Sequence, residues 1–163
     1  MTPADLEKIF GIENTPKSVV PFKSYFLKVM DLVESDAETI KRFENQFSSL
    51  DEGKHNGFAY TVIDSGKPIL CFGLDFQWDG VATAWLLPDK VGIRKNRIKF
   101  HKGALNYFGI VADSYNLHRI EVTVNVRNPY AEKWIKSMGF DYEGTLRQYG
   151  TDKTDHKIYA RLF

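Results

Sequence analysis

The stretch from His118 to Phe140, HRIEVTVNVRNPYAEKWIKSMGF, carries the clearest folding signals in the chain. Residues 118–126 place an apolar side chain at every second position, which predicts a β-strand with one buried face. Asn128-Pro129 then predicts the start of a helix, because Asn is a favoured N-cap and Pro is tolerated at the first helical position. The helix is expected to end at Gly139, where a left-handed C-cap belongs. Its apolar stripe consists of Ala131, Trp134, Ile135 and Met138.

The segments on either side of this stretch predict a mixed sheet and hence an α/β fold. A strand ending at Pro88 is followed by a basic loop, and then by a helix expected from about Ile98 to Tyr115. A strand, a helix and a strand in succession predict a parallel pair with a right-handed crossover. The turn cluster at residues 64–68 predicts an antiparallel hairpin. The expected strands are residues 58–63, 69–74, 81–87, 118–126, 140–146 and 157–163.

The N-terminal third is less regular. Residues 1–17 are expected to form a short helix or an irregular arm, and residues 18–22 an edge strand, since Pro21 cannot donate to a ladder. Residues 25–50 carry apolar side chains at helical spacing and predict two helices or one bent helix, with Ser35-Asp36 as a cap. The whole chain, residues 1–163, is expected to be a single domain.

Composition excludes several classes of protein. Hydrophobic residues make up 43% and aromatic residues 14%, which is typical of a globular chain. The 22 basic and 21 acidic residues leave a formal charge of +1, which argues against a general nucleic-acid binder. The histidines lack metal-ligand spacing, so no metal is expected, and Cys71 alone cannot form an intrachain disulfide. No signal peptide or membrane span is evident, so a cytoplasmic protein is expected.

The C-terminal half resembles the GNAT superfamily of N-acetyltransferases. The residues that carry the resemblance are Asn128, Ala131, Trp134, Gly139 and Phe140, which look like the Asn-x-x-Ala helix of the family ending in Gly-Phe. Glu143-Gly144-Thr145-Leu146-Arg147, with Asp155 and Tyr159, is similar to the branch that acetylates N-termini of ribosomal proteins, and the pattern also resembles small GNAT-type proteins of bacteriophages. The resemblance implies a V-shaped mixed sheet with a splayed parallel strand pair, flanked by helices. It also implies acetyl-CoA as cosubstrate and an amine as acceptor.

The resemblance implies a donor site as well. It places the CoA pyrophosphate at the start of the central helix, where the family usually has glycines and this chain has a basic run without glycine. Asn128 is either an N-cap alone or also a contact to the pantetheine arm. The implied donor-binding residues are Leu86, Leu87, Arg94, Lys95, Asn96, Arg97, Ile98, Lys99 and Asn128.

The catalytic groups are the least defined part of the sequence. Many family members have a Tyr acting as general acid just after the position of Trp134, where this chain has Ile135, and the strand 81–87 contains no carboxylate. Glu121, on the polar side of its strand, is a candidate base, or else it faces solvent. Tyr149 is a candidate acid in place of the missing Tyr, or else a packing residue. The other candidates for the base are Asp75, Asp79 and His118.

Two functional hypotheses follow. The first is an acetyl-CoA-dependent N-acetyltransferase that acts on a protein N-terminus, a lysine or a small-molecule amine. The second is a catalytically degenerate GNAT-like binding or assembly module, for example a part of a phage particle, in which case the protein is located in the virion or the bacterial host cell. RNA binding through the basic run is a third and weaker alternative. The last strand, ending at Phe163, offers an apolar edge to a second copy, which would give a homodimer.

Overall fold

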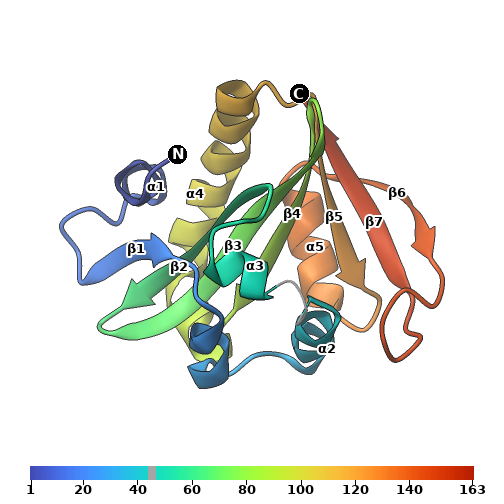
Figure 1. Cartoon of the computed structure of the whole chain (residues 1–163), viewed down its shortest axis with the longest axis horizontal. Coiled ribbons are helices and arrows are strands. Elements are labelled where there is room, and N and C mark those ends of the chain that lie inside the picture. The colour runs from blue at the N-terminus through green and yellow to red at the C-terminus, as the bar shows by residue number, and fades with distance from the viewer. Residues whose placement is uncertain (44–46) are drawn as a thin grey trace.

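The computed structural model describes residues 1–43 and 47–163, and it is a single sheet with helices on both faces (Figure 1). The helical elements are α1 (Pro3–Phe10), the 3₁₀ helix η1 (Ser24–Val29), α2 (Glu34–Phe43), α3 (Phe47–Asp51), α4 (Lys90–Tyr115) and α5 (Pro129–Ser137). The strands are β1 (Lys17–Pro21), β2 (Gly57–Asp64), β3 (Lys67–Trp78), β4 (Val81–Pro88), β5 (Arg119–Asn125), β6 (Asp141–Leu146) and β7 (His156–Leu162).

The sheet has the order β1-β2-β3-β4-β5-β7-β6, and every neighbouring pair is antiparallel except β4 and β5. The parallel pair is joined by α4, so the predicted strand–helix–strand crossover is confirmed. Its pairing covers only the positions from Val81 opposite Arg119 to Thr83 opposite Glu121. Beyond these residues the two strands diverge, and the sheet opens as a V toward the bottom of Figure 1. The predicted mixed, V-shaped sheet is therefore confirmed.

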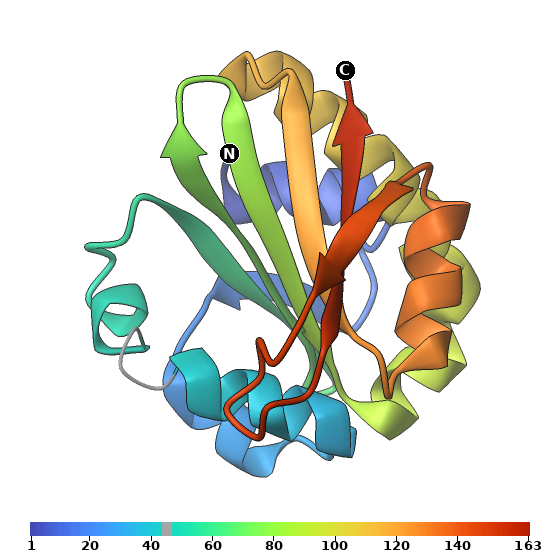
Figure 2. The ribbon, with the colours of Figure 1, turned by 90° about the vertical axis from the view of Figure 1, so that its right-hand side faces the viewer.

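Apolar side chains pack on both faces of the sheet. One cluster joins α1, α4 and α5 to the face that carries Ala82, Ile120 and Val124. A smaller cluster joins η1, α2 and α3 to the opposite face, around Cys71 and Leu87. The alternation of a strand explains this division, because neighbouring residues point to opposite faces. Figure 2 shows α2 and the loop between β6 and β7 at the same end of the sheet, which is the open end of the V.

The N-terminal residues form an integral part of the core. Thr2 and Asp5 form a capping box that starts α1, and α1 buries Leu6 and Phe10 against the central helix. The alternative of an irregular arm is thus wrong for residues 3–10. In the next segment, Ser35 and Asp36 lie within the first turn of α2, so the prediction that they cap a helix is also wrong.

The central helix begins earlier than predicted. Asp89 is its N-cap, and α4 runs from Lys90 to Tyr115, so the basic run at residues 94–99 lies inside the helix and not in a loop before it. Asp89 is a favoured N-cap residue, but the density of basic charge in the following residues favoured a loop in the sequence.

The two edges of the sheet are β1 and β6. The prediction of an edge strand near Pro21 is confirmed, because β1 pairs only with β2. The last strand, β7, pairs on both sides, with β5 and with β6, so the predicted exposed edge at the last strand is wrong. Within the described residues, no helix combines the length and the apolar character that crossing a membrane requires.

Candidate functional site

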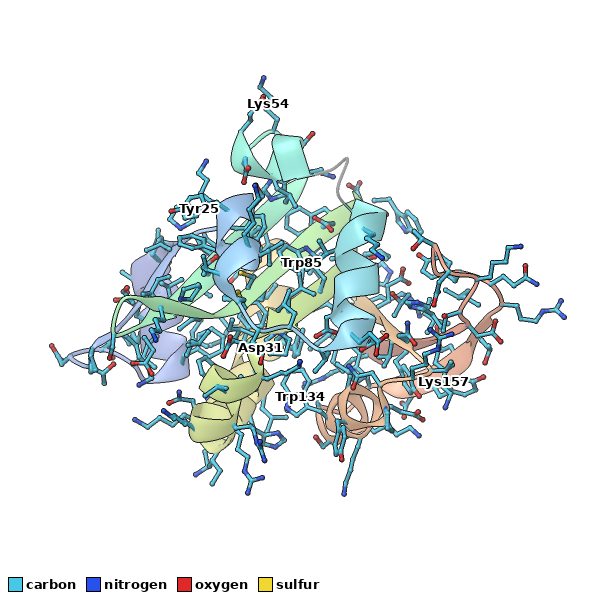
Figure 3. All side chains as sticks on the ribbon, turned by 90° about the horizontal axis from the view of Figure 1, so that it is seen from below. Tyr25, Asp31, Lys54, Trp85, Trp134 and Lys157 are labelled. Atoms are coloured by element: carbon cyan, nitrogen blue, oxygen red, sulfur yellow. The ribbon has the colours of Figure 1, made fainter. Side chains whose placement is uncertain are left out.

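The splay between β4 and β5 is the central feature of the candidate site. We use this name for residues 84–88 of β4 and 122–125 of β5, which follow the last paired positions, Thr83 and Glu121. The inner edges of these two segments have no strand partner, so their N–H and C=O groups are available to an extended ligand. Partly buried apolar side chains from β4, α4 and α5 pack against the core on one face of the sheet here: Ala84, Leu86, Ile93, Ala131 and Trp134. Figure 3 looks into the open end, with α2 lying across it.

The first turn of α4, at the end of β4, is capped by an internal carboxylate. Asp89 Oδ1 accepts hydrogen bonds from the backbone N–H of Val91 at 3.1 Å and of Gly92 at 2.7 Å. Burial alone would raise the pKa of Asp89, but bonds from the N–H groups of Gly92, Asp31 and Val91 outweigh it and hold the pKa below its usual range. Asp89 is therefore an anion placed where the helix dipole favours negative charge.

A segment from the other face of the sheet is fixed to the same turn. The backbone N–H of Asp31 donates to Asp89 Oδ2 at 2.8 Å, and the N–H of Lys90 donates to the Asp31 carbonyl at 2.9 Å. Lys90 Nζ also pairs with the Asp31 carboxylate at 3.1 Å. Since the N–H of Ile93 bonds the Asp89 carbonyl, all the N–H groups of residues 90–93 have partners. The helix start is not available as it stands to bind an external phosphate.

The start of α5, at the end of β5, is occupied by the same segment. Asn128 Oδ1 caps the helix by accepting from the N–H of Ala131 at 3.0 Å, which confirms the predicted N-cap. The Asn128 side chain is also hydrogen-bonded to the carboxyl group of Asp36, in the first turn of α2. Residues 31–36 thus reach from the end of β4 to the end of β5, and we call them the acidic bridge because they contain Asp31, Glu34 and Asp36.

Asp36 has an unusual environment for a carboxyl group. It is partly buried in the first turn of α2, and its carboxyl group is hydrogen-bonded to Asn128 at the start of α5. Burial disfavours the charged form and raises its pKa to about 6, against hydrogen bonds from Asn128 and Ser35 that lower the pKa. A carboxyl group with such a pKa is ionised at neutral pH but more basic than an ordinary Asp, so it can accept and release protons there.

Further polar groups gather at the open end of β5. Asn125, the last residue of β5, is 6% exposed, and its Oδ1 accepts from the N–H of Arg127 at 2.9 Å. Among the described residues its Nδ2 group has no partner. Asn125 pairs with His156 of β7, and the ring of Tyr149 lies edge-on to the His156 ring, 5.3 Å between centroids. Tyr149 is 44% exposed, and it belongs to the loop between β6 and β7, which lies at the same end of the sheet as α2 (Figure 2).

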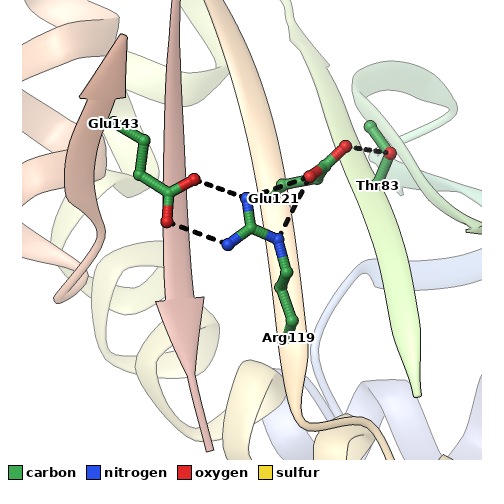
Figure 4. Close-up of polar contacts among 4 residues, drawn as sticks. All are labelled: Thr83, Arg119, Glu121 and Glu143. Carbon is green, nitrogen blue, oxygen red and sulfur yellow. Dashed lines mark hydrogen bonds and ion pairs between the residues drawn. The ribbon is translucent and has the colours of Figure 1, made fainter.

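Glu121 lies at the point where the splay begins, and its carboxylate is already engaged (Figure 4). It accepts from the Thr83 hydroxyl at 3.3 Å and pairs with Arg119 at 3.2 Å. Arg119 also binds both carboxylate oxygens of Glu143, at 2.5 and 2.8 Å. These contacts connect β5 to β4 and to β6. This structural role is sufficient to explain the presence of a carboxylate at Glu121.

The predicted donor-binding residues occupy three different places. The basic run lies on the exposed surface of the first turns of α4, around a shallow depression of about 210 Å³ lined by residues 94–99. Leu86 borders the splay, whereas Leu87 points to the opposite face and is buried there. Asn128 lies at the open end, beside Asp36. The first turns of α4 thus expose basic side chains, whereas the N–H groups of residues 90–93 are all bonded within the chain.

Sequence reasoning missed Asp36, Asn125 and Asp89. Asp89 carried a readable signal, since Asp is one of the favoured N-cap residues. Asp36 and Asn125 carried none, because their significance depends on partners and burial that only the folded chain provides. Among the described residues, no group of three or more His, Cys, Asp and Glu side chains is arranged to hold a metal ion.

Comparison with solved structures identifies the fold. The ribosomal-protein-S5-alanine acetyltransferase from Vibrio fischeri is 19% identical, with a TM-score of 0.62 over 92% of this chain and 94% of that one. The ribosomal L7/L12 alpha-N-protein acetyltransferase RimL, in complex with coenzyme A, is 13% identical, with a TM-score of 0.63 over 92% and 96%. An acetyltransferase of the GNAT family from Bacillus anthracis is 14% identical, with a TM-score of 0.64 over 90% and 95%. No protein-family model and no curated protein matches the sequence.

The chain therefore has the GNAT fold, and the resemblance read from the sequence is confirmed at the level of the fold. At these identities the likeness establishes the arrangement of the backbone. The chemistry of the site depends on this chain's own residues.

Proposed function

We propose that this protein is an N-acyltransferase that moves an acetyl group from acetyl-CoA to an amine. The observation that carries the proposal is the splay, because a parallel pair that separates after Thr83 and Glu121 leaves two strand edges facing each other without partners. The pantetheine arm of CoA is extended and contains amides, so it can pair with such an edge as an added strand would. The apolar residues around Trp134 suit the uncharged part of that arm.

The phosphates of the acyl donor would be held by side chains. Arg94, Lys95, Arg97 and Lys99 are exposed on α4 close to the end of β4, and residues 90–102 contain no acidic residue. Guanidinium groups bind phosphate oxygens strongly and without any need for helix N–H groups. This mode of binding accounts for the absence of glycine from the basic run.

The remaining chemistry has candidate groups at the open end. The buried Nδ2 of Asn125 is a hydrogen-bond donor without a partner among the described residues, and it could bind the oxygen of the thioester carbonyl as negative charge develops there. Tyr149, at the same end, is the candidate acid for the departing thiolate. Glu121 remains a weaker candidate base because Arg119 neutralises its charge.

The closed start of α4 favours the second candidate, a binding or assembly module with the GNAT fold that does not bind CoA. Asp89 and Asp31 occupy the N–H groups on which an external pyrophosphate would depend.

Calorimetry with CoA separates the two functions, followed by mass spectrometry of products from acetyl-CoA and three amines: spermidine, N-α-acetyl-lysine, and a peptide with a free N-terminal alanine. If the protein is an N-acyltransferase, CoA binding should be saturable and at least one amine should gain one acetyl group. A folded protein that shows no heat at millimolar CoA supports the module instead.

A further inference from the structure

We propose that Asp36 is the proton acceptor for the incoming amine, held in place by Asn128 at the open end of the splay. This inference rests on the proposed function and assigns a residue to the one step for which β4 supplies no carboxylate, since β4 contains Thr83 and no acidic residue.

The position of Asp36 follows from contacts at both ends of the acidic bridge. Asp31 is bonded to Asp89 at the end of β4, and Asp36 to Asn128 just after the end of β5. A segment of only six residues therefore crosses the open end of the splay, with Asp36 on the side of β5. A substrate amine that enters from this end meets the bridge before it reaches the strand edges (Figure 3).

The orientation of the carboxyl group is fixed from α5. Asn128 Oδ1 is committed to the N–H of Ala131, so the amide nitrogen of Asn128 is the atom that donates to Asp36. Asn128 thereby links the start of α5 to the proposed base and leaves other lone pairs of the carboxylate for a substrate N–H. A capping residue alone would need only the bond to Ala131.

Charged side chains next to Asn128 form ion pairs with one another. Arg127 pairs with Asp152 at 2.6 Å, and Glu132 of α5 pairs with Lys136 and Lys157 at 2.8 Å. Glu34 is exposed on the same turn of α2 as Asp36. The pKa of Asp36 is set by burial first and then by hydrogen bonds from Asn128 and Ser35.

The proposed reaction balances in protons and in bonds. An alkylammonium ion gives one proton to the Asp36 carboxylate and becomes a neutral amine. The nitrogen lone pair forms the C–N bond to the thioester carbonyl carbon, and the C–S bond breaks as the carbonyl is restored. The sulfur leaves as a thiolate and takes the second proton lost by nitrogen, which gives the amide and the free thiol. Asp36 then releases its proton to solvent, which a pKa of about 6 permits at neutral pH.

The test compares Asp36→Asn with Asp113→Asn, which removes one negative charge at the exposed far end of α4, and with Asp36→Glu. We expect Asp36→Asn to lower kcat/KM at least a hundredfold, within the range for loss of a general base, and to leave the Kd for CoA within twofold. Asp113→Asn should retain wild-type activity, and Asp36→Glu should recover part of it. In the wild type, kcat/KM should fall as the pH drops below about 6, and this limb should be missing from the residual activity of Asp36→Asn.

Two results would overturn the proposal in distinguishable ways. If Asp36→Asn keeps wild-type kcat/KM and the same pH profile, the base lies elsewhere and the enzyme assignment stands. If the wild type acetylates none of the three amines named above, the proposed function fails and the inference fails with it.

Discussion

The backbone N–H of Asp31 donates to the Asp89 carboxylate at 2.8 Å, which joins a segment before α2 to the first turn of α4. This contact, with the bond from Lys90 to the Asp31 carbonyl, places the chain's own groups where a GNAT fold offers a helix start to phosphate. The acyl donor of the proposed reaction must either displace the acidic bridge or bind through side chains, and the first two predictions below distinguish these possibilities.

Asp89→Asn tests whether the Asp89 carboxylate opposes the acyl donor. Asn is as good an N-cap as Asp, so the helix start should persist while one negative charge is lost. We expect CoA to bind about fivefold more tightly, which corresponds to about 1 kcal/mol, the size of one screened charge–charge repulsion at short range. Calorimetry measures the change, and Asp113→Asn at the far end of α4 is the control. Equal affinities for the two variants would mean that the phosphates bind far from Asp89.

Reversing the charges of Arg94 and Arg97 together tests the side-chain mode of phosphate binding. We expect Arg94→Glu with Arg97→Glu to weaken CoA binding at least tenfold, with an effect that shrinks at high salt because exposed charges are screened. Lys8→Glu with Lys54→Glu is the matched control, since it changes the net charge equally at exposed positions outside α4 and the open end. If both pairs weaken binding alike, the effect is one of overall charge.

Asp36→Asn should stabilise the folded protein at neutral pH, although the same substitution is expected to lower activity. The pKa of Asp36 in the folded protein, about 6, lies above the ordinary value of 3.8, so the wild type loses stability as the pH rises from about 4 to about 6. At pH 7.5 the variant should be more stable by about 1–3 kcal/mol, and the difference should vanish near pH 4. Thermal unfolding at the two pH values measures this. A variant less stable than wild type at pH 7.5 would mean that Asn128 stabilises the charged form more than burial opposes it.

Asn125→Leu removes the buried amide at the end of β5. If Nδ2 binds the carbonyl oxygen in the transition state, kcat should fall about a hundredfold. The melting temperature should change little, because the unpartnered donor and the bond to Arg127 disappear together. A large loss of stability with a proportionate loss of activity would assign Asn125 to folding alone.

Tyr149→Phe tests the proposed acid. We expect kcat to fall more than KM rises, because protonation of the thiolate occurs only as the C–S bond breaks. The contact of the ring with His156 should survive, since Phe keeps the ring. Unchanged kcat would remove Tyr149 from the mechanism and leave it as a packing residue at the open end.

The sequence by itself determined the elements whose signals are local. Asn128-Pro129 marks the start of α5, Gly139 has the positive φ expected after its end, and the alternation around Val122 marks β5. The order of strand, helix and strand was sufficient to predict the parallel pair, because two strands joined by a crossover helix in one sheet run in the same direction. The caps and the alternation depend on residues within a few positions of one another, and the parallel pair depends only on the order of the elements.

The tertiary structure alone decided which of these elements make a site. The contacts of Asp31 with Asp89 and of Asp36 with Asn128 join segments that are distant in the chain, and they fix which helix starts are occupied. The raised pKa of Asp36 depends on its burial in the folded chain, and no local pattern encodes it. The physical reason is that hydrogen-bond partners and desolvation are properties of packing, whereas capping and periodicity are properties of the nearby chain.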